Sequence, residues 1–228
     1  MAGRLVVISG TGTEIGKTHA SEALLLAWRA RGLRAVGVKP VESGVPGDAD
    51  SHAAARTDAA RLARASALHV PRFCVALRDP ISPHLAARRE GITIRPEPLV
   101  EAVHALLPSA DLVLVELPGG LFSPLSDTLL NADLAARLVP DAVLLVAPDR
   151  LGVLHDTIAA TRAAAAMALR IDGLILVAPD RPDASSGSNA TELARFVPAP
   201  VLATVGRAPP AELALTPAVV RLASELPR

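Results

Sequence analysis

The chain is poor in aromatic and sulfur-containing side chains, and its charges cancel. Its 228 residues include three phenylalanines, one tryptophan, no tyrosine and one cysteine, Cys74. A single cysteine excludes an internal disulfide and a cysteine-based metal site. So few aromatic rings argue against a surface on which single-stranded nucleic acid stacks. Lysine plus arginine and aspartate plus glutamate balance at 23 each, so no electrostatic attraction to nucleic acid or to an anionic membrane is expected.

Long apolar runs are missing as well. The first ten residues hold only a short apolar run, too short for the apolar region of a secretory signal. No segment approaches the roughly 20 apolar residues of a membrane helix. Together with the lone cysteine, these features predict a cytoplasmic protein that does not bind a membrane. Half of the residues are hydrophobic, which predicts one globular domain over residues 1–228 with a sizeable core.

The chain does contain a regular alternation of short apolar runs and helical patterns. The runs are nearly continuous and β-branched, as strands buried on both faces are; they span residues 4–9, 34–39, 111–117, 141–148, 172–179 and 200–205. Helical patterns lie between them, at 17–30, 57–65, 97–107, 131–138, 155–169 and 189–195. This alternation predicts an α/β fold, a mostly parallel sheet with helices on both faces. Such sheets bind ligands at the carboxyl ends of their strands.

The segment ISGTGTEIGKTHA, residues 8–20, joins the first predicted strand to the first predicted helix. Within this segment, Gly16, Lys17 and Thr18 match the last three positions of a phosphate-binding loop. The first glycine of the usual G-x-x-x-x-G-K-[ST] pattern falls on Thr11, which has a glycine on either side. Glycines here leave backbone N–H groups free to surround phosphate oxygens, at a helix N-terminus that favours anions. The alternative is a glycine-rich turn that binds nothing, against which the position of Lys17 at the helix start argues.

In a working phosphate loop, Lys17 reaches the β- and γ-phosphates and the Thr18 hydroxyl ligates Mg²⁺. Because Mg²⁺ prefers hard oxygen ligands, the carboxylates at the same edge of the sheet are candidates. Glu116 ends a buried strand, and its alternative is a solvated strand end. Asp58 begins a helix, and its alternative is ordinary helix capping.

Two further candidate side chains lie at the end of the second predicted strand and in the loop after it. Lys39 ends that strand at the same edge as the loop, and the alternative is a lysine whose stem covers apolar surface. Ser43 lies in the Gly/Pro-rich loop after it and is compatible with an ordinary turn residue. Both lie at the edge of the sheet where ligands of such folds bind.

Six segments of the chain share their order and spacing with one enzyme family. They read GTGTEIGKT, VGVKPVESG, SPHLAARREG, VELPGG, PLSDTLLNADLA and LGVLHDT, between residue 6 and about residue 180. Together they resemble the dethiobiotin synthetases, ATP-dependent enzymes of biotin synthesis. That family has the same extra residue before Gly16, so the irregular spacing matches it. The resemblance implies a P-loop NTPase-type fold and a homodimer.

The resemblance also implies an ATP-dependent ring closure by a carbon–nitrogen cyclo-ligase. One amine of 7,8-diaminononanoate takes up CO₂ as a carbamate, and a carbamate oxygen attacks the γ-phosphate of ATP. The second amine then attacks the carbamic–phosphoric anhydride, which gives the cyclic urea of dethiobiotin, with ADP and phosphate. Phosphoryl transfer depends mainly on positioning and charge neutralisation, which the lysines and Mg²⁺ would supply.

The resemblance assigns roles to particular residues of this chain. The implied catalytic residues are Lys17, Lys39 and Thr13. Nucleotide binding is implied for Gly12, Glu14, Ile15, Gly16, Lys17, Thr18 and Glu116, and Mg²⁺ binding for Thr18, Asp58 and Glu116. Substrate binding is implied for Thr13, Glu14, Lys39, Ser43, Ser82, Gly152 and His155, the last two from the other subunit.

Four positions depart from the family's pattern, one of them His155, which stands where the family has an asparagine that binds the substrate tail. Leu117 and Pro118 stand where the family has Gly-Ala, and a proline there removes one N–H donor. Pro179 replaces the asparagine that reads the nucleotide base, so the chain lacks an amide that could pair with an adenine edge. These changes leave the nucleotide preference open, as well as the contacts of residues 206–212 near the base.

Three other functions fit parts of the pattern. A partition-type ATPase would carry a lysine at the position of Gly12, so the glycine there argues against that class of protein. A cobalamin-pathway amide synthetase would have a glutaminase domain with a catalytic cysteine, whereas Cys74 has no nucleophile context. A nucleotide-binding regulatory protein that has lost catalysis remains the alternative, because of Pro118 and Pro179.

Overall fold

The computed structural model describes residues 3–46, 55–69 and 75–226; Cys74 lies outside these ranges. The main sheet has six parallel strands in the order β2-β5-β1-β6-β7-β8. Its strands are β1 (Arg4–Gly10), β2 (Ala35–Val38), β5 (Leu112–Glu116), β6 (Ala142–Pro148), β7 (Gly173–Val177) and β8 (Val201–Val205). These correspond to the six predicted strands, and the predicted parallel sheet is confirmed.

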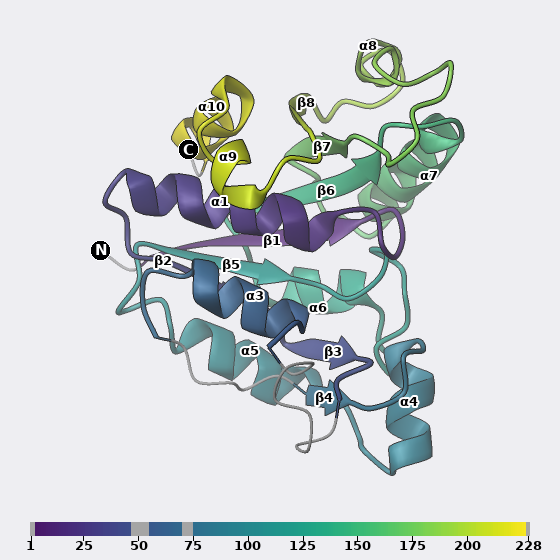
Figure 1. Cartoon of the computed structure of the whole chain (residues 1–228). Coiled ribbons are helices and arrows are strands. Elements are labelled where there is room, and N and C mark those ends of the chain that lie inside the picture. The colour runs from purple at the N-terminus through teal and green to yellow at the C-terminus, as the bar shows by residue number, and fades with distance from the viewer. Residues whose placement is uncertain (1–2, 47–54, 70–74, 227–228) are drawn as a thin grey trace.

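Helices cover both faces of this sheet (Figure 1). Along β1, Leu5 and Val7 belong to one hydrophobic core while Val6 and Ile8 belong to the other. Because successive side chains of a strand point to opposite faces, a strand between two cores has to be apolar throughout. This accounts for the continuous apolar runs of the sequence.

The six predicted helices are all present, with ends that differ by at most three residues. They are α1 (Lys17–Ala30), α3 (Asp58–Ala65), α5 (Pro96–His104), α6 (Asn131–Arg137), α7 (Val153–Ala166) and α8 (Asn189–Leu193). Helices α1 and α3 contribute to the core that contains Val6, and α5, α6, α7 and α8 to the core that contains Leu5. No helix within the described ranges has the length and apolar character needed to cross a membrane.

Five short elements lack a clear sequence pattern and were not predicted. They are β3 (Val41–Ser43), β4 (Val75–Leu77), α4 (Pro83–Glu90), α9 (Pro210–Leu213) and α10 (Pro217–Glu225). Strands β3 and β4 pair with each other in a separate parallel ribbon. Three-residue strands are too short for periodicity, and half of α4 is charged or histidine, so its apolar stripe is narrow.

The strand register brings candidate site residues to one edge. Ile8 of β1 is level with Glu116 of β5, and Val38 of β2 is level with Val115. Lys39 directly follows Val38, so it lies beside Glu116 at the carboxyl end of the sheet. The loop after β1 opens at this same edge.

Candidate active site

The loop between β1 and α1 contains two glycines at which a side chain would displace a neighbour. A Cβ on Gly10 would lie 2.6 Å from Ile15 Cδ1, and one on Gly16 would lie 2.7 Å from Val177 Cγ1. Gly16 also has a φ of 95° as the residue before α1, a conformation that L side chains rarely adopt. The glycine before Thr11 therefore serves packing, and Gly16 serves both packing and the turn.

Lys17 is folded back over this loop. Its Nζ donates a hydrogen bond to the Gly12 carbonyl at 2.8 Å, and the residue is 6% exposed. Burial lowers the pKa of Lys17 to about 8, although the carboxylates of Glu116 and Asp58 oppose the shift. Lys17 is therefore mostly protonated at pH 7 and faces a cavity in which it could neutralise a phosphate.

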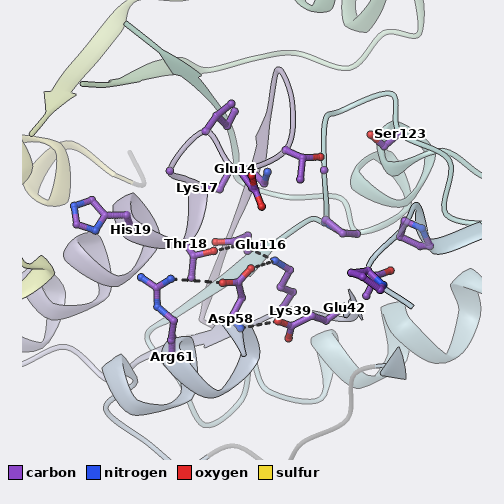
Figure 2. Close-up of a pocket in the computed structure, with 18 of the residues that line it drawn as sticks. Glu14, Lys17, Thr18, His19, Lys39, Glu42, Asp58, Arg61, Glu116 and Ser123 are labelled. Atoms are coloured by element: carbon purple, nitrogen blue, oxygen red, sulfur yellow. Dashed lines mark hydrogen bonds and ion pairs between the residues drawn. The ribbon is translucent and has the colours of Figure 1, made fainter. Parts of the chain in front are cut away.

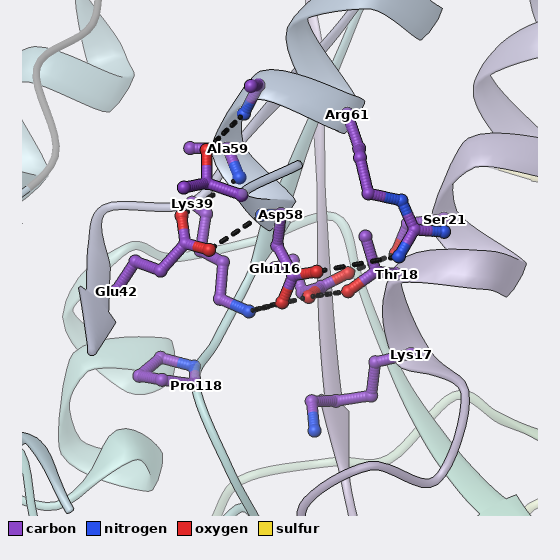
Figure 3. A network of polar contacts seen from close by, with 12 residues as sticks. Lys17, Thr18, Ser21, Lys39, Glu42, Asp58, Ala59, Arg61, Glu116 and Pro118 are labelled. Carbon is purple, nitrogen blue, oxygen red and sulfur yellow. Dashed lines mark hydrogen bonds and ion pairs between the residues drawn. The ribbon is translucent and has the colours of Figure 1, made fainter. Parts of the chain in front are cut away.

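Glu116 is the buried centre of the polar network (Figures 2 and 3). It has no exposed surface. One carboxylate oxygen accepts from Thr18 Oγ1 at 2.7 Å and Lys39 Nζ at 3.1 Å, and the other accepts from Ser21 Oγ at 2.8 Å. The alternative of a solvated strand end is thus wrong, because burying a carboxylate requires such partners.

Lys39 bridges the two carboxylates. Its Nζ pairs with Asp58 Oδ2 as well as with Glu116, and the residue is 8% exposed. Burial lowers the pKa of Lys39, but the charges of Glu116 and Asp58 outweigh burial, so the pKa lies above its ordinary value. Lys39 is accordingly a buried, permanently charged group rather than a stem covering apolar surface.

The Asp58 carboxylate is not used to cap its own helix. At the start of α3 the Thr57 hydroxyl accepts from Ala60 N at 3.3 Å. Glu42 accepts from Asp58 N at 2.6 Å and from Ala59 N at 3.0 Å. With these donors satisfied, Asp58 is free to face Lys39. Burial raises the pKa of Asp58, but the charge of Lys39 outweighs it, so the pKa lies below its ordinary value.

These donors fit a magnesium ion whose remaining ligands come from phosphate and water. Thr18 Oγ1, Glu116 and Asp58 supply hydroxyl and carboxylate oxygens around the Lys39 ammonium. The described part of the chain holds no cluster of three His, Cys, Asp or Glu residues suited to a metal. Mg²⁺ is usually bound by one or two carboxylates together with substrate phosphates, so this donor set suits it better than a site formed by protein ligands alone.

A cavity of about 690 Å³ opens over this network. Most of the predicted site residues line it: Thr13, Glu14, Ile15, Gly16, Lys17, Thr18, Lys39, Ser43, Asp58, Ser82 and Glu116. Gly12 does not line it, and meets the site through its carbonyl on Lys17. The structure therefore brings the predicted phosphate, metal and carbamate residues together in one place.

Two serines lie on the wall away from the phosphate loop. The Ser43 hydroxyl is buried and makes no hydrogen bond to any described residue. Ser82 Oγ lies 2.9 Å from His84 Nδ1, at the N-terminus of α4. Ser82 Oγ also donates to the Pro124 carbonyl at 3.5 Å. Of the two hydroxyls, that of Ser43 is the one left without a described partner and available to a substrate.

Gly152 and His155 lie outside the cavity of their own chain. Both are exposed, at the start of α7, and the neighbouring Leu151 is 78% exposed. The predicted role of these two residues in binding substrate from the other subunit stays a prediction.

The loop that contains Pro118 is held without the N–H that proline lacks. The Asn131 side-chain amide donates to the carbonyls of Pro118 and Gly120, the latter at 2.7 Å. Leu121 N donates to the Gly10 carbonyl at 2.8 Å. These bonds tie the loop to the phosphate loop without using an N–H at position 118.

Several residues of the site were not predicted from the sequence. Ser21, Glu42, Arg61, His19 and Arg207 bond to site residues or line the cavity. Ser21 lies one helical turn after Thr18, and this spacing could have identified it. The others come from segments that are distant in the sequence or turn toward the site only in the folded chain.

Two loops, one after β7 and one after β8, meet near Arg207, which lines the cavity. Arg207, after β8, pairs with Asp180 at 3.0 Å. Ala178 N donates to the Val205 carbonyl at 2.9 Å, which places Pro179 beside residues 206–207. The loop after β8 thus lies beside Pro179, and its contact with a nucleotide base stays a prediction.

The parallel sheet, the phosphate loop and the buried lysines and carboxylates define a P-loop nucleotide-binding protein. Residues 4–213 match a family model described as an AAA domain. Among solved structures, the septum site-determining protein MinD of Pyrococcus horikoshii, complexed with Mg-ADP, has a TM-score of 0.61 at 18% identity over 99% of this chain and 96% of that one. A ParA family ATPase of Chlorobium tepidum has a TM-score of 0.60 at 14% identity over 99% of both chains. Likeness at such low identity shows the fold alone.

Curated relatives narrow this class. The ATP-dependent dethiobiotin synthetase BioD of Ralstonia nicotianae is 40% identical over 222 residues, or 97% of this chain and 96% of the relative. BioD 1 of Escherichia coli K12 is 35% identical over 87% of this chain and 88% of the relative. The chain belongs to the ATP-dependent dethiobiotin synthetase family.

Proposed function

We propose that this protein forms dethiobiotin, ADP and phosphate from 7,8-diaminononanoate, CO₂ and ATP. The observation that carries the proposal is that Lys17, Lys39 and Glu116 share one cavity with the Ser43 and Ser82 side chains. The buried Ser43 hydroxyl has no hydrogen-bond partner among the described residues. A cavity that only hydrolysed or sensed a nucleotide would not need this second polar wall. Family membership supports the same reaction.

The proposed chemistry follows from where the charges lie. The Lys39 ammonium would neutralise the carbamate, and the Ser43 hydroxyl would donate to one of its oxygens. Lys17 would hold the transferring phosphoryl group, where preorganised positive charge stabilises the transition state. Thr18, Asp58 and Glu116 would hold Mg²⁺, which when bound neutralises phosphate charge.

We further propose a homodimer in which Gly152 and His155 bind the substrate tail in the partner's site. The exposure of both residues and of Leu151 beside them supports this arrangement. ATP as co-substrate and the single cysteine in the sequence fit a cytoplasmic enzyme.

The test is product formation from ¹³C-bicarbonate, the diamine and MgATP. Mass spectrometry should find one ¹³C in the ureido carbonyl, with one ADP and one phosphate for each dethiobiotin. Lys17→Ala serves as the catalytically impaired control. Wild-type protein that binds ATP but forms no labelled product would contradict the proposal and favour a regulatory nucleotide-binding protein.

A further inference from the structure

The Asp58 carboxylate is contacted by a cation on each side (Figure 3). Its Oδ2 pairs with Lys39, and its Oδ1 lies 3.6 Å from Arg61 Nη1. Arg61 is one turn further along α3 and also lines the cavity. The two contacts come from different elements, so one can persist while the other changes.

Arg61 is itself anchored from α1. Its Nη2 lies 2.5 Å from Glu22 Oε2, and the Glu22 side chain is only 13% exposed. The planar guanidinium holds both carboxylates with one rigid group, which a lysine could not do with equal geometry. Glu22 therefore fixes the place from which Arg61 contacts Asp58.

The charges of Glu22 and Arg61 affect how readily Asp58 can bind a cation. An unpaired arginine beside Asp58 would compete with a divalent cation for the carboxylate. Glu22 neutralises Arg61, so the pair adds orientation to Asp58 without adding net positive charge. The charge of Lys39 is instead balanced within the site, by Asp58 and Glu116, the two carboxylates assigned to the metal.

We propose that Arg61, anchored by Glu22, is a positioning residue that keeps Asp58 oriented for Mg²⁺ while Lys39 is free to turn to the substrate. The inference rests on the proposed function in one respect, the assignment of Asp58 to the metal. Partners of metal ligands typically change metal affinity by about 10- to 100-fold when removed. Arg61 contacts Asp58 as an ion pair at 3.6 Å rather than by a hydrogen bond, so we expect the low end of that range.

The experiment measures binding of Mn²⁺, as a paramagnetic substitute for Mg²⁺, to full-length protein saturated with ADP. Arg61→Gln should raise the Mn²⁺ Kd by about tenfold or more, while affinity for ADP in EDTA stays within about twofold. Arg61→Lys should be intermediate, since it keeps the charge but not the fork. Arg64→Gln, on the exposed side of the same helix, is the matched control and should bind Mn²⁺ as wild type does.

Glu22 supplies an independent arm. Glu22→Gln should also weaken Mn²⁺ binding, and Glu22→Gln combined with Arg61→Gln should be no worse than Arg61→Gln alone, because both act through one contact. A wild-type Mn²⁺ Kd in both Arg61→Gln and Glu22→Gln would overturn the proposal. Equal losses of ADP affinity with and without metal would overturn it too, since they indicate a general structural effect.

These measurements need neither the diamine nor turnover. Failure to form labelled dethiobiotin would therefore contradict the proposed function while leaving the role of Arg61 decided by metal binding alone.

Discussion

Replacing Lys39 by methionine should destabilise the protein, and divalent cation should reverse much of the loss. Methionine has a similar length but no charge, so the substitution leaves Glu116, which has no exposed surface, and Asp58 without their shared cation. The two carboxylates would then repel each other within a largely buried site. Mg²⁺ with ADP would restore a cation between them.

The size of the effect follows from the geometry. Lys39 Nζ is 3.1 Å from Glu116 Oε1, which gives about 5 kcal/mol of attraction at an effective dielectric constant of about 20. Removing one partner of a buried pair typically costs about 3–5 kcal/mol. Glu116 keeps the hydrogen bonds from Thr18 and Ser21, so we expect the low end, about 3 kcal/mol. For a chain of 228 residues this corresponds to a fall in Tm of about 6–12 °C.

The assay is thermal unfolding of wild type and Lys39→Met, in EDTA and with saturating MgADP. The difference between the two proteins should shrink by at least half when MgADP is present. Arg221→Met, which removes an exposed cation from α10, is the control and should change Tm by less than about 2 °C. An unfolding free energy of Lys39→Met within about 1 kcal/mol of wild type in EDTA would refute the reasoning, as would an equal deficit with and without MgADP.

The remaining predictions concern catalysis, metal, nucleotide and assembly. Lys17→Ala should lower kcat/KM by several kcal/mol of transition-state stabilisation while the circular dichroism spectrum is unchanged; near-wild-type turnover would exclude a phosphate-binding role. Asp58→Asn and Glu116→Gln should each raise the Mg²⁺ concentration for half-maximal activity by about tenfold or more, because a neutral amide is a poorer ligand for a hard cation; unchanged Mg²⁺ curves would remove that residue from the metal site. With Pro179 unable to read a base edge, ATP should be preferred over CTP or GTP by less than about tenfold, or 1.4 kcal/mol, in kcat/KM; a hundredfold preference would indicate that the C-terminal loop reads adenine. Sedimentation at micromolar concentration should show a dimer that Leu151→Asp weakens, and a fully active monomer would contradict the shared site.

The secondary structure was largely predictable because the sheet is buried on both faces. Short, β-branched apolar runs such as residues 142–148, alternating with helical patterns, are typical of strands between two layers of helix, and this predicted their number and parallel arrangement. The elements that were missed, such as β3 and α4, are held by neighbours rather than by their own pattern. Strand β3, for example, pairs with β4, which lies more than thirty residues further along the chain.

The candidate site was predictable where one segment carries the chemistry. Gly16, Lys17 and Thr18 lie together in the sequence, and their position at a helix start already indicates phosphate binding. The chain's two lysines, Lys17 and Lys39, both lie in this site, and each was identified from its place at a strand or helix end. Sequence alone could not choose between a metal ligand and a helix cap for Asp58, because both need a carboxylate at a helix N-terminus.

The sequence by itself determined the fold class, the phosphate loop and the family, because each depends on residues that are close together or on a periodicity that local geometry imposes. Only the tertiary structure decided which charged side chains pair with one another and which cap a helix. Glu42 takes over the cap of α3, and Arg61 reaches Glu22 on another helix. The physical reason is that hydrogen bonds and ion pairs act over a few ångströms in space, whatever the separation along the chain. Which carboxylate remains free for a cation therefore depends on how the helices pack.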